Sequence, residues 1–219
     1  MIPRTLEPEV MESEADARDY DSMDHSAVNK KFVADFLARC PQSEGTILDV
    51  GTGTAQIPIE LCRQSHTASV VAIDLSDEML KIGRHNAAVA GFAERICLER
   101  MNASAMSYSG GTFAAVISNS IIHHIPKPAA CFAEIVRVAR TGATVFVRDL
   151  MRPDSGEDVD RLVDLHAAGA NAHQRQLFRD SLHAALTLSA VRETVSALGF
   201  AASTVQATSD RHWTWFATA

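Results

Sequence analysis

The sequence predicts an α/β fold: a single Rossmann-like, doubly wound, mostly parallel seven-stranded sheet with a C-terminal antiparallel hairpin and helical N-terminal and 153–188 lid segments. Three observations predict it. Short apolar runs alternate with amphipathic stretches across residues 46–150. A turn with two glycines, Gly51 and Gly53, joins the first apolar run to a helical pattern, and Asp74 ends the second apolar run. Alternating strands and helices form a parallel sheet that is covered on both faces.

The N-terminal elements come first. Pro3, Pro8 and many acidic residues precede a helix that we expect from about Glu9 to Arg18. Asp24 is the expected cap of a longer helix, because short polar side chains accept from the first free N–H groups. That helix places apolar residues on one face and ends at Pro41 and Gly45. The apolar residues are Val28, Phe32, Val33, Phe36 and Leu37.

The central pattern then predicts five strands and three helices. We expect Ser76 to cap the second helix and Gly91 to follow its end. The expected strands are 46–50, 69–74, 95–100, 112–118 and 143–150, and the expected helices are 55–65, 76–90 and 128–140.

The pattern changes after Pro153, where about 35 residues lack a strand signal. One helix is expected around Val159–Leu165, another over Gln174–Leu188, and a third from a cap at Ser189 to Gly199. Strands 201–207 and 211–217 close the chain, with Trp213 and Trp215 on one face. We therefore expect one domain over 1–219, divided into an N-terminal helical cap (1–40), a cofactor-binding core (41–150), a helical lid (151–188), and a closing helix and hairpin (189–219).

The glycine turn indicates a nucleoside pocket. Two glycines permit a tight turn and bring backbone N–H groups close to a ligand. A carboxylate such as Asp74 can accept both ribose hydroxyls. In the dinucleotide fingerprint G-x-G-x-x-G, the third glycine is here Gln56, and no Walker-type phosphate loop is present. Asp49 would repel a pyrophosphate and suits an ammonium group better.

Four stretches carry a resemblance to a known family. They are L-D-V-G-T-G-T-A at 48–55, V-A-I-D-L-S-D-E-M-L at 71–80, F-A-A-V-I-S-N-S-I-I-H-H-I at 113–125, and the segment from Val136 to Leu150. In this order and spacing the chain resembles the class I S-adenosylmethionine (SAM)-dependent methyltransferases, closest to the small-molecule branch of ubiquinone-biosynthesis type. The resemblance covers residues 30–150 well and the rest by layout only.

The resemblance implies SAM as the cofactor and a set of binding residues. One position departs from the family pattern, since Asn102-Ala103 replaces the usual Asp-Ala. An Asn can still accept from and donate to an adenine ring. Met79 is either core or adenine contact. The implied cofactor-binding residues are Asp49, Gly51, Gly53, Thr54, Asp74, Leu75, Met79, Asn102, Ala103 and Asn119.

The amino-acid composition limits the kinds of partner that we expect for this chain. The net charge of −7, without a Lys/Arg run longer than two, argues against nucleic acid. No apolar run reaches 18 residues, so no membrane span is expected, and Met1–Val10 has no secretory core. The cysteines have no zinc spacing and read as buried thiols, which favours the cytoplasm. The expected partner is a small-molecule methyl acceptor, and a homodimer stays open. The cysteines are Cys40, Cys62, Cys97 and Cys131.

Four residues are candidates for catalysis. His123 and His124 follow the fourth strand at the edge where parallel sheets bind ligands, although either could simply hold its loop. Tyr20 could reach the SAM carboxylate, and His25 begins the helix expected beside the cleft. A hydroxyl or amine acceptor needs a base, and a histidine titrates near neutrality. A thiolate acceptor needs none.

Other interpretations remain. A nicotinamide oxidoreductase would share the sheet, although the missing third glycine counts against it, and a SAM-binding partner protein without activity is a further alternative. Arg148 and Asp149 either pair structurally or meet the acceptor. A metal-assisted methyltransferase that uses His123, His124 and Asp149 is another alternative. We expect no metal, because two adjacent histidines on an extended chain would point to opposite sides and could not easily bind one ion. The three histidines of the lid segment are expected mostly at the surface: His166, His173 and His183.

Overall fold

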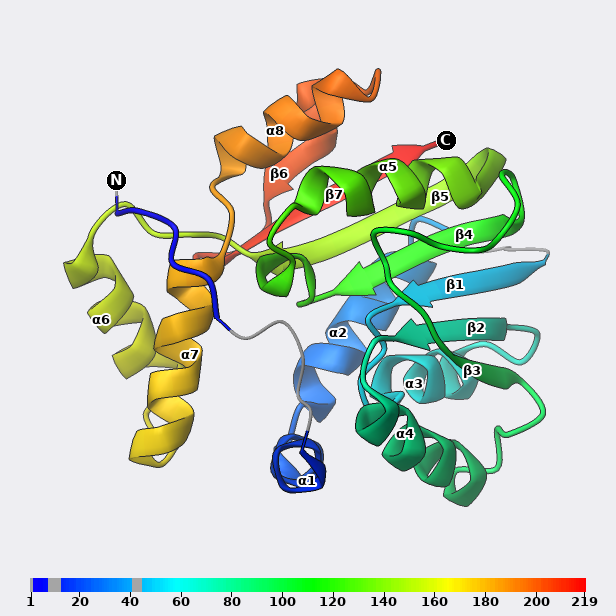
Figure 1. Cartoon of the computed structure of the whole chain (residues 1–219), viewed down its shortest axis with the longest axis horizontal. Coiled ribbons are helices and arrows are strands. Elements are labelled where there is room, and N and C mark those ends of the chain that lie inside the picture. The colour runs from blue at the N-terminus through cyan, green and yellow to red at the C-terminus, as the bar shows by residue number, and fades with distance from the viewer. Residues whose placement is uncertain (1, 8–12, 41–44) are drawn as a thin grey trace.

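The computed structural model describes residues 2–7, 13–40 and 45–219. Its centre is a seven-stranded sheet in the order β3-β2-β1-β4-β5-β7-β6 (Figure 1). The strands are β1 (Thr46–Val50), β2 (Ser69–Asp74), β3 (Ile96–Arg100), β4 (Phe113–Asn119), β5 (Ala139–Leu150), β6 (Val205–Ala207) and β7 (His212–Thr218).

The direction of the strands confirms the predicted fold class. The first five strands pair in parallel, whereas β7 runs antiparallel between β5 and β6. The order reverses beside β1, which pairs with β2 on one side and β4 on the other. In open α/β sheets, ligands bind at this switch point, outside the carboxyl ends of the strands.

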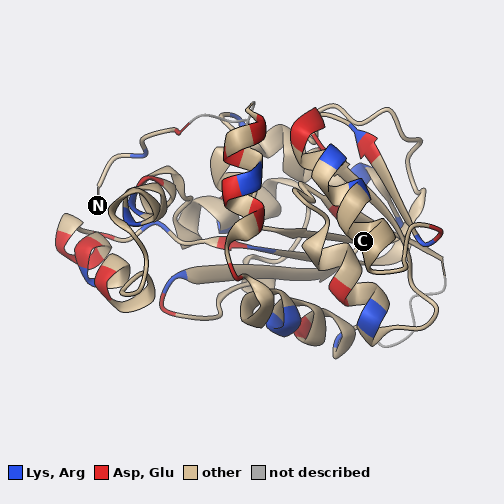
Figure 2. Cartoon of the chain, turned by 90° about the horizontal axis from the view of Figure 1, so that it is seen from below, with Lys and Arg blue, Asp and Glu red and all other residues tan. Residues whose placement is uncertain are grey.

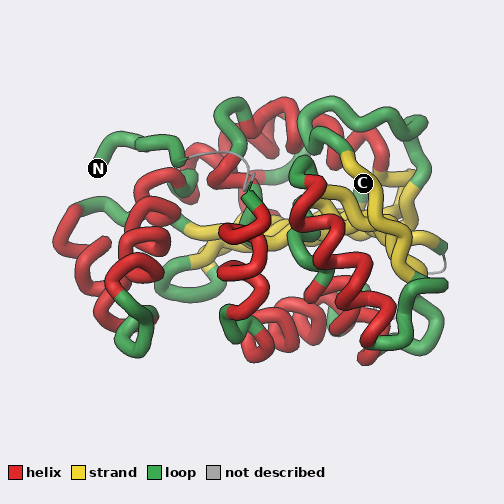
Figure 3. Tube along the Cα trace, turned by 60° about the horizontal axis from the view of Figure 1, so that its bottom comes forward, coloured by secondary structure: helices red, strands yellow, loops and turns green. Residues whose placement is uncertain are grey.

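Helices cover both faces of the sheet (Figure 3). On one face, α2 (Ser26–Leu37) and α3 (Gln56–Gln64) pack onto side chains such as Ile47 and Phe146. On the other, α5 (Pro128–Val138) and α8 (Leu188–Ala197) pack onto Leu48 and the two tryptophans of β7. Consecutive residues of one strand therefore serve opposite cores, as the two-residue period of a strand requires.

Helix caps explain where the central helices begin, and they correct one prediction. Ser76 caps α4 (Asp77–Val89) as predicted, since its side chain accepts from the N–H of Met79. The cap of α8 is Thr187 rather than Ser189, because the Thr187 hydroxyl accepts from the N–H of Ala190 at 3.2 Å. The Ser189 hydroxyl instead pairs with that of Thr187.

The N-terminal helices differ in their bounds from the prediction. Helix α1 (Glu14–Ser22) begins after Ser13, whose side chain accepts from a free N–H of the first turn, and it continues beyond Arg18. Before α2, His25 occupies the cap position and makes no cap bond. Asp24 still contributes, because its carboxylate accepts from the N–H of Ser26 at 2.9 Å. The predicted start at Glu9 and the stop at Pro41 lie outside the described residues.

Two predicted ends in the second half of the chain also shift. The long strand β5 begins at Ala139, so α5 ends two residues earlier than expected. The expected strand 201–207 is shortened to β6, because residues 202–204 form a 3₁₀ turn in which the Thr204 hydroxyl bonds the Ala201 carbonyl.

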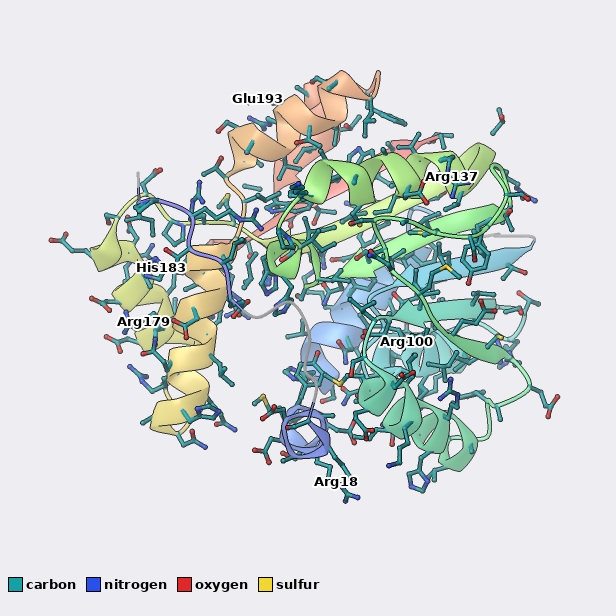
Figure 4. All side chains as sticks on the ribbon, viewed as in Figure 1. Arg18, Arg100, Arg137, Arg179, His183 and Glu193 are labelled. Atoms are coloured by element: carbon teal, nitrogen blue, oxygen red, sulfur yellow. The ribbon has the colours of Figure 1, made fainter. Side chains whose placement is uncertain are left out.

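The segment after β5 forms two packed helices, α6 (Gly156–His166) and α7 (Ala172–Ala184). Both stand at the carboxyl ends of the parallel strands (Figure 1). An apolar cluster that includes Val159, Leu162 and Leu182 lies between them. Arg179 of α7, labelled in Figure 4, pairs with Asp160 of α6, so charges tie the pair together at its surface.

Residues 2–7 run along this helix pair, and we call them the N-terminal strap. Arg4 donates to backbone carbonyls on two elements: Ala184 at the end of α7, and His123 and Ile125 in the turn after β4. The N–H of Thr5 also bonds the carbonyl of His183, a residue labelled in Figure 4 beside the strap. The sequence pattern gave no sign of this segment's role.

Within residues 2–7, 13–40 and 45–219, no helix combines the length and apolar character that crossing a bilayer requires.

Candidate functional site

The glycine turn is fixed to the end of the neighbouring strand. The N–H groups of Gly51 and Thr52 both donate to the carbonyl of Ile73, at 2.8 and 2.9 Å. The N–H of Gly53 donates to the Asp74 carboxylate at 2.8 Å. Gly51 has φ +75°, and an added Cβ would stand 2.0 Å from Ile121, so only glycine fits there. The turn is therefore rigid before any ligand arrives.

Among the residues that the structure describes, several buried polar oxygens around this turn have no hydrogen-bond partner. They belong to Asp49, Thr52, Thr54 and Asn119, from the ends of β1 and β4 and the turn between β1 and α3. Such groups are nearly always hydrogen-bonded in native proteins, because burying one without a partner costs free energy. Four of them at one switch point indicate a polar ligand site.

The two predicted carboxylates behave differently. Asp49 is 1% exposed, and burial, with a further contribution from Asp74, raises its pKa to about 7. Burial also raises the pKa of Asp74, although backbone N–H bonds from Ser76 and Gly53 oppose this. A cation placed against Asp49 would restore its ionised form. This pair of carboxylates therefore suits a positively charged ligand.

Tyr20 lies beside the turn, and His25 packs against Tyr20. Tyr20 lines the same small cavity as Gly51, Thr54 and Asn119. Burial, with the nearby Asp74, Asp21 and Asp49, raises the pKa of Tyr20 to about 12, so its hydroxyl stays protonated as a donor. The His25 ring packs against the Tyr20 ring with centroids 5.0 Å apart, and its buried Nε2 has no hydrogen-bond partner in the described part of the chain.

The remaining predicted cofactor residues stand around the end of β2 and the loop after β3. Met79 is 6% exposed and Ala103 is also buried, whereas Leu75 is half-buried and its carbonyl accepts from Arg100. The side-chain oxygen of Asn102 accepts from the N–H of Ser104 at 2.8 Å. One lone pair of this oxygen is therefore engaged locally, and the second lone pair and the NH₂ group of Asn102 could meet an adenine.

A polar network under the turn was missed by the sequence reasoning. Asn29 donates to Gln56 at 3.1 Å, and Gln56 and Asn86 both donate to Asp21. Asn86 also bonds the carbonyl of Thr54. Gln56 occupies the place of the third fingerprint glycine, so its side chain joins α3 to α1 and α2. Only that substitution in the sequence could have pointed to the network.

His123 lies in a second cluster, away from the Tyr20–His25 pair. It belongs to η1 (Ile122–His124), a 3₁₀ turn after β4. Its Nδ1 stands 2.5 Å from the Asp149 carboxylate, which also accepts from the N–H of Ile122 and Leu150. Burial alone would lower the pKa of His123, but Asp149 and Glu7 raise it. A raised pKa favours the imidazolium form, which is less suited to act as a base.

His124 and Glu7 complete this second cluster. Glu7 Oε1 lies 3.4 Å from Nε2 of His123 and 3.2 Å from Nδ1 of His124. The two rings stack with centroids 4.1 Å apart. The expectation that the adjacent histidines point to opposite sides is therefore wrong, because the chain forms a 3₁₀ turn there rather than an extended strand.

Arg148 and Asp149 take structural positions. Arg148 is 8% exposed and pairs with Asp35 of α2 at 2.8 Å, with its guanidinium over the Phe32 and Phe146 rings. Asp149 points to the other face, toward η1.

Among the remaining candidates, His166 and His173 are exposed, and His183 is half-buried. All four cysteines are free, and Cys97 on the edge strand is exposed, contrary to the expected burial.

The part of the chain that carries the glycine turn is similar to known methyltransferases. Residues 47–142 match a family model described as a methyltransferase domain. A demethylmenaquinone methyltransferase of Roseiflexus castenholzii is 31% identical over 52% of this chain and 46% of its own length. The UbiE ubiquinone/menaquinone biosynthesis C-methyltransferase of Geobacter sulfurreducens is 29% identical over 51% and 44%. The chain thus spans less than half the length of the curated relatives it matches.

Solved structures share the fold. A SAM-dependent methyltransferase from Aquifex aeolicus superposes with a TM-score of 0.64 at 16% identity, covering 94% of this chain and 98% of that one. Phosphoethanolamine N-methyltransferase 2 of Haemonchus contortus, solved with S-adenosylhomocysteine, gives a TM-score of 0.61 at 18% identity over 78% and 37%. The resemblance inferred from the four motifs is confirmed.

Proposed function

We propose that this chain, which carries a class I SAM-dependent methyltransferase domain, transfers a methyl group from SAM to a small-molecule acceptor by in-line displacement. The observation that carries the proposal is the set of unpartnered buried oxygens at the glycine turn. The family match over 47–142 covers the same turn and supports SAM as the ligand. When bound, SAM supplies an electrophilic methyl carbon on its sulfonium.

The chain's own residues bind and orient this cofactor. Asp49 takes the ammonium group, because it is buried and has an oxygen without a partner. Asp74 accepts the ribose hydroxyls with the lone pairs that Gly53 and Ser76 leave free. Tyr20 stays protonated and donates to the methionine carboxylate. Holding both reactants in line can lower the barrier by about 7–11 kcal/mol.

His25 is the base that we propose for a hydroxyl or amine acceptor. Burial lowers its pKa, which keeps the ring neutral at physiological pH, and its Nε2 is unpartnered. A neutral imidazole with a free nitrogen can take a proton. For a thiolate acceptor no base is needed, and proximity alone would then carry the reaction.

We propose that the strap, η1, α6 and α7 form the acceptor side, with residues 151–188 as a lid within one domain over 1–219. The family match over 47–142 includes η1 but not the strap, α6 or α7. The quinone names of the relatives are therefore not carried over to the acceptor of this chain. Figure 2 shows Lys and Arg scattered among acidic residues, with no helix covered mainly by basic residues, which favours a small molecule over nucleic acid. A cytoplasmic location also belongs to this proposal.

Fold alone does not decide the chemistry, since a [4+2]-cyclase also shares it with a TM-score of 0.55. The test is calorimetry of SAM and NAD, followed by methyl-labelled SAM with a metabolite extract. We expect SAM to bind and label to appear in a small molecule. Tighter binding of NAD would indicate an oxidoreductase, and SAM binding without transfer to any metabolite would indicate a non-catalytic partner protein.

A further inference from the structure

We propose that Glu7, His123 and His124 form a binding site for a divalent transition-metal ion of the zinc class. Their ligand atoms, one carboxylate oxygen and two imidazole nitrogens, lie within 4.8 Å of one another. The glutamate comes from the N-terminal strap and the histidines from η1, more than a hundred residues later. Such a site is independent of SAM binding and would fix the strap to the end of β4.

The distances fit a metal better than an ion pair. Charge-assisted N–H···O bonds are about 2.7–2.9 Å long, whereas Glu7 Oε1 stands 3.4 and 3.2 Å from the two imidazole nitrogens. Ligand atoms at about 2.0–2.1 Å from a tetrahedral ion are separated by roughly 3.3–3.4 Å, the edge of the tetrahedron. Both separations lie close to that edge.

The surroundings of His123 resemble the support of a metal ligand. Its Nδ1 faces the Asp149 carboxylate at 2.5 Å, which accepts the Nδ1 proton and turns Nε2 toward Glu7. Ligating histidines almost always donate their other ring N–H to a carboxylate or carbonyl. With the Nδ1 proton on the Asp149 side, the lone pair of a neutral Nε2 faces the Glu7 carboxylate oxygen, and a metal ion between them would bind both atoms.

The position of the third ligand is also fixed. Glu7 accepts from the Ser181 hydroxyl of α7 at 3.1 Å, and Arg4 holds the backbone of the strap to η1. The Glu7 and His123 side chains are 10% and 4% exposed, and that of His124 is 27% exposed. Three protein ligands with one partly open side are typical of zinc sites that keep a fourth position for water or a substrate atom.

The test uses the full chain without a histidine tag, stripped with a chelator. Titration with Zn²⁺ by calorimetry should give one site per chain with micromolar or tighter affinity, and Co²⁺ should give the visible absorption of a four-coordinate ion. The variants Glu7→Gln and His124→Ala should each weaken binding by at least about 100-fold. Asp149→Asn should weaken it by about 10–100-fold, because the supporting carboxylate is lost.

His173→Ala is the matched control, because His173 is an exposed histidine of α7 outside the cluster, and it should bind metal as the parent does. Far-ultraviolet circular dichroism and SAM affinity show whether each variant is folded. Glu7→Gln lies outside the sheet and keeps the side-chain volume, so it is the variant expected to fold if another does not. Absence of a micromolar site in the parent, or unchanged affinity in both Glu7→Gln and His124→Ala, would leave the cluster as an ion pair only and overturn the proposal.

Discussion

Asp49 and Asp149 are both 1% exposed and both lie near the carboxyl ends of central strands, yet their surroundings are opposite. Asp49 keeps an oxygen without a partner, and burial raises its pKa to about 7. Burial would also raise the pKa of Asp149, but His123 and backbone N–H groups hold it below the usual value. The first carboxylate is available to a ligand, whereas the second is fully used in positioning η1.

The same contrast extends to the two sides of the cleft. On the cofactor side, polar groups at the glycine turn are buried and left open. On the strap side, Arg4, Glu7 and Asp149 are bonded to other parts of the chain. Polar groups without a partner are available to bind the cofactor, which is the same in every turnover. Polar groups that already have partners hold the strap and η1 in position. Substitutions on the two sides should therefore differ in their effect on SAM binding and on turnover.

The largest expected effect is on turnover, and it concerns His25. His25→Ala should lower turnover by about 10²–10⁴ with little change in SAM affinity, if His25 takes the acceptor proton. Because its pKa lies below the ordinary value, the parent rate should rise with pH through an ionisation below about 6.5 and stay level above it. Initial rates from pH 5.5 to 9, with an acceptor found by methyl labelling, measure this.

The cluster of Glu7, His123 and His124 gives a comparison for that experiment. His123 has a raised pKa, so a base at that position would give a rate that rises through a higher ionisation. A flat profile in the parent, with turnover surviving in His25→Ala, would mean that no base acts and that the acceptor arrives already anionic.

The next effect concerns the cofactor alone. Asp74→Ala should weaken SAM binding by about 2–3 kcal/mol, because two charge-assisted hydrogen bonds are lost. Asp74 also accepts from the N–H of Gly53, so Asp74→Asn, which keeps one acceptor oxygen, should cost less. Calorimetry on both variants separates ribose contact from support of the turn. Unchanged SAM affinity in Asp74→Ala would mean that the ribose does not bind at this end of β2.

The cofactor side was largely readable from the sequence, and the strap side was not. The four predicted cofactor residues Asp49, Gly51, Gly53 and Asp74 belong to one strand-turn-helix-strand unit, where spacing along the chain determines proximity. The contact between Glu7 and His124 joins residues 117 apart in the sequence, with no local pattern to announce it. Only the packing of the strap onto η1 and α7 brings them together, and sequence periodicity carries no information about that.

The wrong prediction about His123 and His124 has a related cause. The sequence predicts an extended chain at the histidines that follow the fourth strand, whereas Ser120 adopts φ +58° and turns the chain into η1. A non-glycine residue with positive φ is uncommon, and no residue type marks it in advance. Thr187 replacing Ser189 as a cap is a smaller instance, since both side chains can cap a helix equally well.

A smaller effect is expected from pH on cofactor binding. The pKa of Asp49 is raised to about 7 in the free protein, and an ammonium ligand requires the ionised form. SAM affinity should therefore fall by roughly tenfold per pH unit below about 7, with a proton released on binding, and should level off above it. Calorimetry in buffers of different ionisation enthalpy measures the proton. In Asp49→Asn the affinity should be weak and independent of pH over this range.

The smallest effect is expected at Gly91, which belongs to neither the cofactor side nor the strap side. This residue follows the end of α4 with φ +79°, and an added Cβ would meet nothing within 4 Å. Gly91→Ala should therefore cost about 1 kcal/mol of unfolding free energy, from the left-handed backbone alone. Urea denaturation gives this figure, and SAM affinity should match that of the parent, because Gly91 contacts no oxygen of the turn. If Gly91→Ala weakened SAM binding as much as Asp74→Ala, losses at Asp74 would reflect general loosening of the fold, and the contrast between open and bonded carboxylates would lose its functional meaning.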